Sequence, residues 1–310
     1  MPTIDRGHAR STTPIFLPAI RRVPDDLCTI EVPPVYFYTF ELEKNMSSLK
    51  IATWNVNGIR ARETQVLEWV ERERPDVVCL QELKSTVAQV PAALCELQGY
   101  RCYWHGARAY SGVGLHIRRD AFAAEPRFFH PSFDFETRVV AAQMDDLVAV
   151  SAYVPNGGKD FAAKMQFLRE VKNYVREVHA SGVRLVFCGD LNIARTERDV
   201  HPKERNPGII GQRPEERELF EQILGHGLVD VGRALDPDNE NLFTWWAPWR
   251  RMRERNIGWR LDYVLASHSL AARASQCSVQ REIGTSDHAP VVAVFDLDHD
   301  AGASMTREPE

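Results

Sequence analysis

Short apolar runs alternate with polar, turn-forming stretches along most of this chain, and the runs have the length of buried strands. We predict strands at 49–54, 76–80, 100–105, 112–117, 139–144, 147–154, 185–188, 260–266 and 290–297. A hydrophobic spacing of three to four residues predicts helices at 64–74, 90–97, 161–178 and 214–224. Pro75 after the first helix and Pro214 in the first turn of the last helix fit these limits.

The two ends of the chain lack this pattern. Residues 1–48 hold six prolines without sustained periodicity, so we predict a flexible leader there, with Met46 as an alternative translation start. Residues 299–310 are polar, and we predict a disordered tail. No repeat or linker divides the chain between them, which predicts one domain over residues 49–298.

Composition narrows the class of protein. The 310 residues are 44% hydrophobic and 26% charged, as in globular proteins, and no apolar run approaches the roughly 20 residues that a membrane span requires. The formal net charge of −5 means that any nucleic-acid binding must come from local basic patches. Six cysteines without C-x-x-C spacing favour a reducing compartment over a disulfide framework, and we predict a cytoplasmic protein.

Polar side chains recur where predicted strands end or begin. They are Asn55, Asn57, Glu82, Asn156, Asp190, Asn192, Asp287 and His288. Gly189 is expected to break the strand at 185–188, and spacing by two residues in an extended segment then places Asp190 and Asn192 on one side. Acids and amides gathered on one rim suit an oxygen-preferring cation such as Mg²⁺, although each residue alone could be a turn former.

A histidine that takes a proton from water needs a carboxylate to fix its tautomer. His288 follows a turn signal at 284–286, and Asp262, an acid inside an apolar strand, needs a partner. We predict that these two side chains pair. Tyr153 lies in an apolar strand before 155–158, and for it a catalytic hydroxyl and an ordinary core position both stay open.

Seven motifs follow one another in a characteristic order. They are W-N-V-N-G-I-R at 54–60, L-Q-E at 80–82, Y-S-G-V-G at 110–114, A-Y-V-P-N-G-G at 152–158, G-D-L-N at 189–192, G-W-R-L-D-Y at 258–263 and S-D-H-A-P at 286–290. Together they strongly resemble the exonuclease III family of abasic-site (AP) endonucleases, within the endonuclease/exonuclease/phosphatase superfamily. G-D-x-N and S-D-H alone mark only the superfamily, whereas G-W-R-L-D-Y and the first motif narrow the resemblance to its DNA-repair branch.

The resemblance implies a DNase I-like α/β fold, a four-layer sandwich in which two mixed β-sheets pack face to face and helices flank them. It implies a catalytic domain at 49–298, with Asp190 as proton donor or acceptor and His288 as the base that Asp262 orients. The implied catalytic residues are Tyr153, Asp190, Asn192, Asp262 and His288. The implied ligands of Mg²⁺, for which Mn²⁺ could substitute, are Asn57, Glu82, Asp190, Asn192, Asp287 and His288, with Glu82 the principal one.

The resemblance also implies contacts to the substrate. The expected phosphate or DNA contacts are Asn55, Asn156, Arg60, Lys159 and Arg253. Trp245, Trp259 and Leu261 match positions that line a pocket for a flipped sugar lacking its base, although core packing is the alternative for both tryptophans. The long polar loop at 195–213 is where family members differ, and we expect it to tune the balance of activities.

These implications add up to a Mg²⁺-dependent nuclease that hydrolyses the phosphodiester 5′ to an abasic site in duplex DNA. Removal of damaged 3′ ends and 3′→5′ exonuclease activity are expected as well, in a monomer without a membrane partner, nucleoid-associated if bacterial. The alternatives are a phosphodiesterase or phosphatase acting on a non-DNA substrate and a DNA-binding scaffold with a decayed site. The arginine run at 250–255 and the tryptophans of the expected pocket argue against the first alternative, and the complete set of polar residues argues against the second.

Overall fold

The computed structural model describes residues 47–107 and 110–297. The predicted leader up to residue 46 and the predicted tail lie outside the described residues. Ser48, which the sequence assigns to the leader, already begins the first strand. None of the helices in the described ranges has the length and hydrophobicity needed to cross a bilayer.

The first sheet, as far as the chain is described, has six strands in the order β11-β12-β1-β2-β4-β3. Their bounds are Ser48–Asn55 for β1, Val77–Gln81 for β2, Tyr100–His105 for β3, Val113–Arg118 for β4, Ala274–Val279 for β11 and Val291–Asp296 for β12. β1 runs parallel to β2, and the other neighbours run antiparallel, so the sheet is mixed.

The second sheet, over the same described ranges, also has six strands, in the order β5-β6-β7-β8-β10-β9. Their bounds are Arg127–Phe129 for β5, Val139–Met144 for β6, Leu147–Tyr153 for β7, Arg184–Asp190 for β8, Leu228–Asp230 for β9 and Asp262–Ser267 for β10. β7 and β8 are parallel, and the remaining pairs are antiparallel. Each sheet therefore brings the ends of several strands to one edge.

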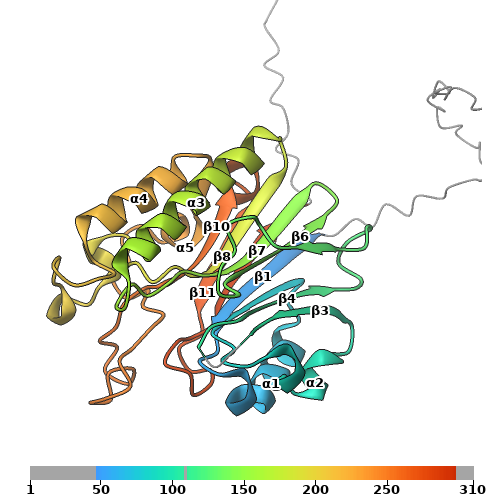
Figure 1. Cartoon of the computed structure of the whole chain (residues 1–310), viewed down its shortest axis with the longest axis horizontal. Helices are drawn as coiled ribbons and strands as arrows, with labels where there is room; N and C mark the ends of the chain where they lie inside the picture. Colours follow the sequence, from blue (N-terminus) through green and yellow to red (C-terminus); the bar gives the residue numbers. More distant parts are fainter. Residues whose placement is uncertain (1–46, 108–109, 298–310) are drawn as a thin grey trace, which may run out of the picture. The chain divides into compact units, whose positions relative to one another are not determined.

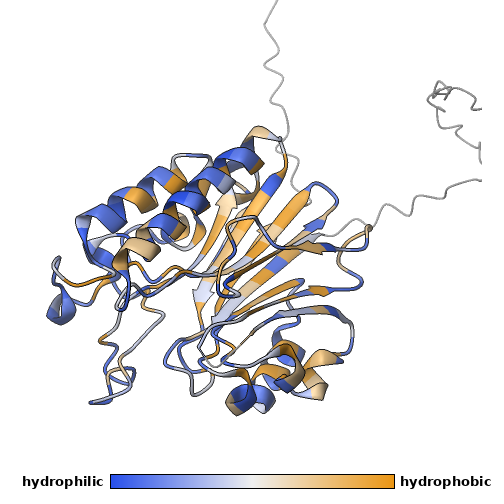
Figure 2. Ribbon diagram, viewed as in Figure 1, coloured by the Kyte–Doolittle hydropathy of each residue, from blue (hydrophilic) through white to orange (hydrophobic). Residues whose placement is uncertain are grey.

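The two sheets pack face to face through alternate apolar residues. Ile51 and Cys79 of the first sheet belong to one buried cluster with Val186 and Val264 of the second. Helices cover the outer faces, α1 and α2 on the first sheet and α3 and α4 on the second (Figure 1). The strands are mostly hydrophobic and the long helices are two-sided (Figure 2), which is the pattern of a sandwich between helical layers. The predicted four-layer α/β fold is confirmed.

Helices appear close to where the hydrophobic spacing predicts them. The bounds are Glu63–Glu73 for α1, Ala92–Cys95 for α2, Phe161–Ala180 for α3, Pro214–Leu224 for α4, Val231–Leu235 for α5 and His268–Ala271 for α6. Short 3₁₀ turns occupy Ile59–Arg62, Val87–Gln89, Glu197–Asp199 and Pro202–Glu204. Asp160 caps α3 by accepting from the N–H of Ala163 at 2.9 Å. The loop at 195–213 is therefore not structureless, because it contains two of these turns.

The prediction that Gly189 ends its strand is wrong. β8 continues through it to Asp190, with a φ of +143° at Gly189. A Cβ at this position would lie 1.9 Å from the backbone oxygen of Ala152 on β7. The glycine thus permits a close approach of two strands rather than a break, and it brings Asp190 into register with β7.

Candidate active site

Three polar side chains form a row across the second sheet. Tyr153 of β7 is the register partner of Asp190 of β8, which is the partner of Asp262 of β10. Register partners point to the same face of a sheet. All three are buried, with exposed fractions of 9% for Tyr153 and 1% for each aspartate. The row therefore places two acids and a hydroxyl where water has little access.

His288 joins this row from the loop before β12. Its Nδ1 lies 2.8 Å from Asp262 Oδ2, and its Nε2 lies 3.8 Å from Asp190 Oδ2. Asn55, at the end of β1, donates from Nδ2 to the same Asp190 oxygen at 2.9 Å. The structure thus brings together the pair that the sequence predicts and connects it to Asp190 and to the first sheet.

Burial and neighbouring charges shift the protonation of this row. Burial raises the pKa of Asp190 to about 7; the charge on His288 opposes this rise and that of Asp262 reinforces it. Burial alone would lower the pKa of His288, but the charges of Asp262 and Asp190 outweigh it and raise that pKa to about 10. Burial, then the charges of Glu82 and Asp190, raise the pKa of Tyr153, so its hydroxyl stays protonated. Asp190 is therefore the group placed to exchange a proton near neutral pH.

Asn192 lies beyond β8 in a left-handed turn with a φ of 52°, not in an extended segment as the sequence predicts. Its N–H donates to Asp190 Oδ1 at 2.9 Å, and its Nδ2 donates to the Val154 carbonyl at 2.9 Å. Asn156 donates from Nδ2 to Asn192 Oδ1 at 3.3 Å. The side chains of Asp190 and Asn192 do meet, but the turn brings them together rather than strand alternation.

A buried ion pair lies beneath these amides. Lys164 of α3 and Glu216 of α4 are both fully buried, with Nζ 2.5 Å from Oε1. The same ammonium donates to the carbonyls of Asn192 at 2.7 Å and Asn156 at 3.3 Å. Glu216 Oε2 accepts from the N–H of Gly211 at 2.7 Å. This pair could not be predicted from the sequence, because a lysine among the charges of an amphipathic helix is normally solvated.

Two of the predicted metal ligands, Asn57 and Glu82, contact the ammonium of Lys84. Asn57 Nδ2 donates to Asp287 Oδ1 at 2.6 Å, and Trp245 Nε1 donates to Asp287 Oδ2 at 3.0 Å. The ammonium of Lys84 donates to Asn57 Oδ1 at 2.5 Å and pairs with Glu82 at 2.9 Å. The oxygens of Glu82 and Asn57 thus converge on one positive charge, as a divalent ion would require of them. These residues therefore fit a metal ion.

Five of the six predicted ligands fall into two groups, and the sixth, Asn192, is hydrogen-bonded to Asp190. Asp190 and His288, with Asp262, offer ligand atoms within 4.8 Å of one another and could themselves hold a metal ion. Asn57, Glu82 and Asp287 form the other group, with Lys84 between its oxygens. Lys84 was not among the predicted site residues. Its position two residues after Glu82, the principal predicted ligand, is the feature of the sequence that could have indicated it.

Two tryptophans form a wall next to His288. The rings of Trp245 and Trp259 are 5.7 Å apart at 77°, and backbone bridges connect Trp245 to both Trp259 and His288. Leu261 follows and is buried. The indole Nε1 of Trp259 is buried without a hydrogen-bond partner in the described part of the chain. The predicted pocket residues are therefore gathered beside the row, with a donor left for a ligand.

The predicted DNA contacts differ in their availability. Arg60, Asn156 and Lys159 are exposed. Arg253 is engaged elsewhere, since its guanidinium donates to the carbonyls of Arg281, Ser286 and Ile283. It also lies 5.1 Å over the Trp246 ring. Arg253 thus clamps a turn, and it also lines the hollow described next, so its predicted contact to phosphate stays a prediction.

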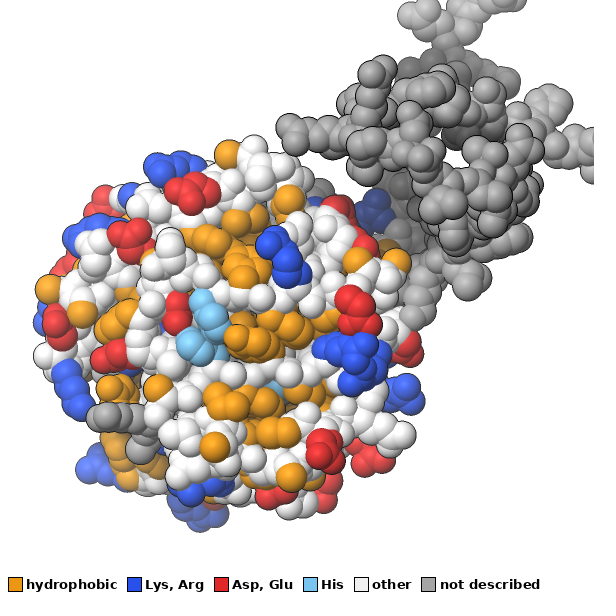
Figure 3. All heavy atoms as spheres, turned by 45° about the vertical axis from the view of Figure 1, so that its right-hand side comes forward, with side chains coloured by type: hydrophobic (Ala, Val, Ile, Leu, Met, Phe, Trp, Pro, Cys, Tyr) orange, Lys and Arg blue, Asp and Glu red, His pale blue; other side chains and the backbone are white. Residues whose placement is uncertain are grey.

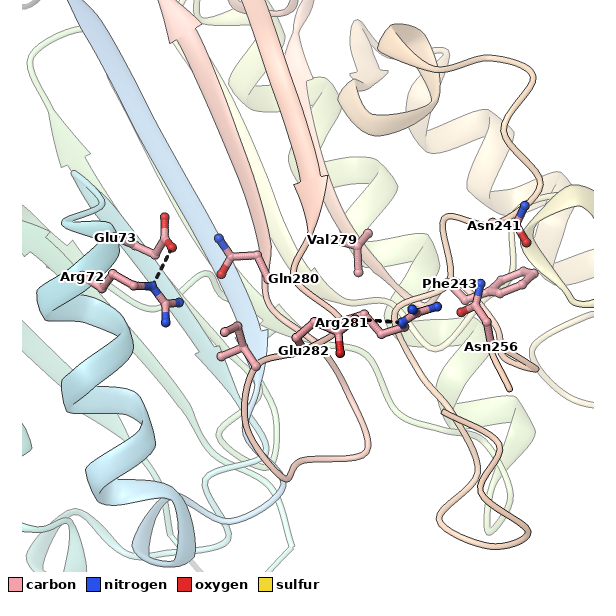
Figure 4. A pocket seen from close by; sticks show the side chains of 10 residues that line it. Arg72, Glu73, Asn241, Phe243, Asn256, Val279, Gln280, Arg281 and Glu282 are labelled. Atoms are coloured by element: carbon pink, nitrogen blue, oxygen red, sulfur yellow. Dashed lines mark hydrogen bonds and ion pairs between the residues drawn. The ribbon is translucent and has the colours of Figure 1, made fainter. Parts of the chain in front are cut away.

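Two hollows differ in their relation to the site. One of about 680 Å³ is lined by Asn57 and Asp287 together with Arg62 and Arg251, so it opens directly beside the predicted metal ligands. Another, of about 570 Å³, lies between the end of α1 and the segment 279–283 (Figure 4). Its lining includes Gln280 and Phe243 but none of the predicted site residues. The first hollow is the candidate entrance for a substrate.

Comparison with known proteins fits this geometry. Residues 52–288 match the Endonuclease/Exonuclease/phosphatase family. The DNA repair nuclease APEX1 of Danio rerio is 34% identical over 79% of this chain and 81% of its own length. The exodeoxyribonuclease of Bacillus subtilis is 31% identical over 80% of this chain and 100% of its length. Recombination repair protein 1 of Drosophila melanogaster is 31% identical, and the chain spans only 37% of that protein.

Solved structures agree with these matches. An AP endonuclease from Archaeoglobus fulgidus has a TM-score of 0.73 and 30% identity, over 80% of this chain and 100% of the other. The 3′ phosphatase NExo from Neisseria, bound to a product DNA hairpin, has a TM-score of 0.73 and 32% identity, over 80% of this chain and 99% of the other. The chain therefore belongs to the endonuclease/exonuclease/phosphatase family and, within it, to the DNA repair nucleases that include exodeoxyribonucleases and AP endonucleases.

Proposed function

We propose that this chain is a Mg²⁺-dependent nuclease that hydrolyses the phosphodiester on the 5′ side of an abasic site in duplex DNA. Removal of blocked 3′ ends and 3′→5′ exonuclease activity belong to the same proposal. The observation that carries it is the buried row of Tyr153, Asp190 and the Asp262–His288 pair beside the wall of Trp245 and Trp259. The names of similar proteins, AP endonuclease and 3′ phosphatase among them, support the substrate class.

The protonation states of these side chains suggest a different role for each residue of the row. Asp190, with its pKa near neutrality, accepts the proton of the attacking water, since proton transfer is best at a pKa close to the working pH. His288 keeps its proton because two carboxylates surround it, so it offers a positive N–H to a phosphate oxygen. The sequence-based role of His288 as the base is therefore not the one we favour. The protonated hydroxyl of Tyr153 and the amide of Asn192 can donate to the same phosphate, which stabilises charge that builds in the transition state.

Glu82, Asn57 and Asp287 are the residues that we propose hold Mg²⁺, with Mn²⁺ as a substitute. When bound there, the ion would neutralise charge on the phosphate and on the leaving oxygen. Burial would raise the pKa of Asp287, but the charge of His288 and the hydrogen bonds from Trp245 and Asn57 prevail and lower it. Asp287 therefore stays ionised and available as a ligand.

The aromatic wall supports a preference for abasic sites. A sugar without its base leaves the duplex at lower cost than an intact nucleotide, and it fits a small apolar recess. The unpartnered Nε1 of Trp259 can donate to an oxygen of that sugar or its phosphate. Exposed cations such as Arg60 and Lys159 suit the DNA backbone. We further propose that the chain acts as a monomer in the cytoplasm, on the nucleoid if the source is bacterial.

One experiment tests this function. The full chain is incubated with a labelled duplex carrying one abasic-site analogue, and separately with an intact duplex that has a recessed 3′ end, in Mg²⁺ and in EDTA. We expect incision at the analogue in Mg²⁺, none in EDTA, and none with Asp190→Asn in either. If neither duplex is cut while a non-nucleic phosphodiester is hydrolysed, the alternative reading as a phosphodiesterase with a non-DNA substrate replaces this one.

A further inference from the structure

Two histidines and an aspartate meet at the edge of the sandwich, outside the catalytic row. His105 ends β3 of the first sheet, His130 follows β5 of the second sheet, and Asp134 lies in the loop between β5 and β6. One ligand atom from each of the three lies within 4.8 Å of the other two. We propose that these residues form a Zn²⁺ site that connects the two sheets.

Outer hydrogen bonds already orient the three side chains. Asp134 Oδ1 accepts from the N–H groups of Arg138 and Val139, both at 2.8 Å, which leaves Oδ2 facing His105 Nε2 at 2.7 Å. His130 Nδ1 lies 3.1 Å from the carbonyl of Val139, which can only accept, so this nitrogen carries the proton. His130 Nε2 therefore keeps its lone pair, which accepts from the hydroxyl of Tyr103 at 3.0 Å and would turn to the ion when one is bound. A ligating histidine typically donates its other ring N–H to a carbonyl in this way.

The donor set selects the ion. Two imidazoles and one carboxylate suit Zn²⁺ and its neighbours among the transition metals, whereas Mg²⁺ prefers oxygen ligands alone. At present a proton joins His105 to Asp134. Zn²⁺ bound at Nε2 would displace that proton, so that His105 binds as the neutral imidazole protonated on Nδ1 and the charge of the carboxylate is paired with the ion. His130 is exposed, and the side chains of His105 and Asp134 are 21% and 13% exposed. The site thus has an entry path and room for a water molecule as fourth ligand.

The position of the site gives the ion a structural task. β3 and β6 lie on the side of the sandwich that Figure 3 turns forward. The loop after Asp134 carries Arg138, whose guanidinium donates to the Tyr153 carbonyl at 3.4 Å and lies 5.0 Å over the Tyr153 ring. A bound ion would therefore fix both the inter-sheet edge and the support of a catalytic tyrosine.

The test measures Zn²⁺ binding to the full chain, because the catalytic row can also take up the ion. Metal-free wild type, His130→Ala and the control His268→Ala, an exposed histidine of α6, are compared by equilibrium dialysis against Zn²⁺. We expect wild type and the control to bind one Zn²⁺ more per chain than His130→Ala. The melting temperature should rise with Zn²⁺ more in the first two proteins than in His130→Ala.

A second variant distinguishes loss of a metal ligand from misfolding. Asp134→Asn keeps the Oδ1 acceptor for the two N–H groups and removes the charge that the ion needs. We expect at least about tenfold weaker binding at this site in the variant, and loss of the visible absorption that Co²⁺ gives in wild type. Equal Zn²⁺ stoichiometry and equal melting shifts in wild type, His130→Ala and Asp134→Asn would overturn the proposal.

Discussion

Replacing Lys164 by methionine removes a positive charge from beneath the loops that carry Asn156 and Asn192. The ammonium is 2.5 Å from Glu216 and donates to both asparagine carbonyls. Methionine keeps an unbranched stem of similar volume, so the change isolates the loss of charge and of these hydrogen bonds. Glu216 would remain fully buried with no cation next to it.

The expected loss of stability in Lys164→Met follows from the burial of the ion pair. Breaking a buried ion pair by removing one partner costs about 3–5 kcal/mol, because the other charge stays desolvated. In a domain of this size each kcal/mol lowers the melting temperature by about 2–4 °C, so a loss of about 6–20 °C is expected. A shift of about 1 Å in the Asn192 amide costs about 100-fold in rate. We therefore expect kcat to fall about 10- to 100-fold with little change in KM, because Asn192 acts on the transition state.

Urea unfolding and steady-state cleavage of one abasic duplex, well below the melting temperature, measure both effects. The control is Lys172→Met on the same helix, whose ammonium, within the described part of the chain, bonds only the neutral side chain of Gln222 at 3.1 Å. This variant should stay within about 0.5 kcal/mol of wild type. In Lys164→Met/Glu216→Gln, which removes the unpaired charge but keeps an acceptor for the N–H of Gly211, part of the stability should recover while kcat stays low. A Lys164→Met protein with wild-type kcat would refute the positioning role, and one with wild-type stability would refute the energetic reasoning.

Three further changes test other parts of the structure. Asp190→Ala or His288→Ala should abolish cleavage while DNA binding stays within about tenfold in a filter assay, since both act on the transition state; wild-type turnover would overturn their assignment. Trp259→Ala should reduce incision at abasic sites more than digestion of intact 3′ ends, and equal losses would refute the pocket. His116 is buried with no hydrogen-bond partner among the described residues, and burial lowers its pKa from 6.5 to about 4. The folded chain binds fewer protons between these values, so stability should fall by about 3 kcal/mol as the pH drops through them. His116→Leu should flatten that part of the urea-unfolding profile, and an unchanged slope would count against the argument.

Buried strands are the elements that the sequence predicts best. The strand Val139–Met144 has the predicted limits, because an apolar run buried on both faces leaves few other conformations. Tyr100–His105 also has the predicted limits, although it is an edge strand that is only partly buried. β11, with the sequence A-S-Q-C-S-V, was not predicted, since it is an edge strand with little apolar content. β5, β9, α5 and α6 are short and gain their form from neighbours rather than from their own pattern.

The candidate site, like the fold, has parts that the sequence predicts and parts that it does not. The residue types at the strand ends could be predicted, because turn-forming polar residues after apolar runs reveal the rim. The supporting charges could not, because Lys164 pairs with a residue 52 positions away and a helical lysine normally reaches solvent. Arg253 shows the converse case, where a residue in a basic run donates to backbone carbonyls, a contact that its sequence context does not reveal. Sequence spacing carries local information, whereas charge pairing depends on which helices and loops the fold places together.

The proposed catalytic and metal-binding residues come from both sheets, and this has a mechanical consequence. Asn55 and Glu82 end strands of the first sheet, whereas Tyr153, Asp190 and Asp262 belong to the second. The bond from Asn55 to Asp190 crosses between them at 2.9 Å. The distance between the proposed metal ligands and the proposed base is therefore set by the apolar layer between the sheets, since close-packed interiors transmit small displacements. The same argument applies to the proposed Zn²⁺ site. An ion that joins the two sheets at their edge would restrain the spacing between them, and with it the distance between the proposed metal ligands and the proposed base.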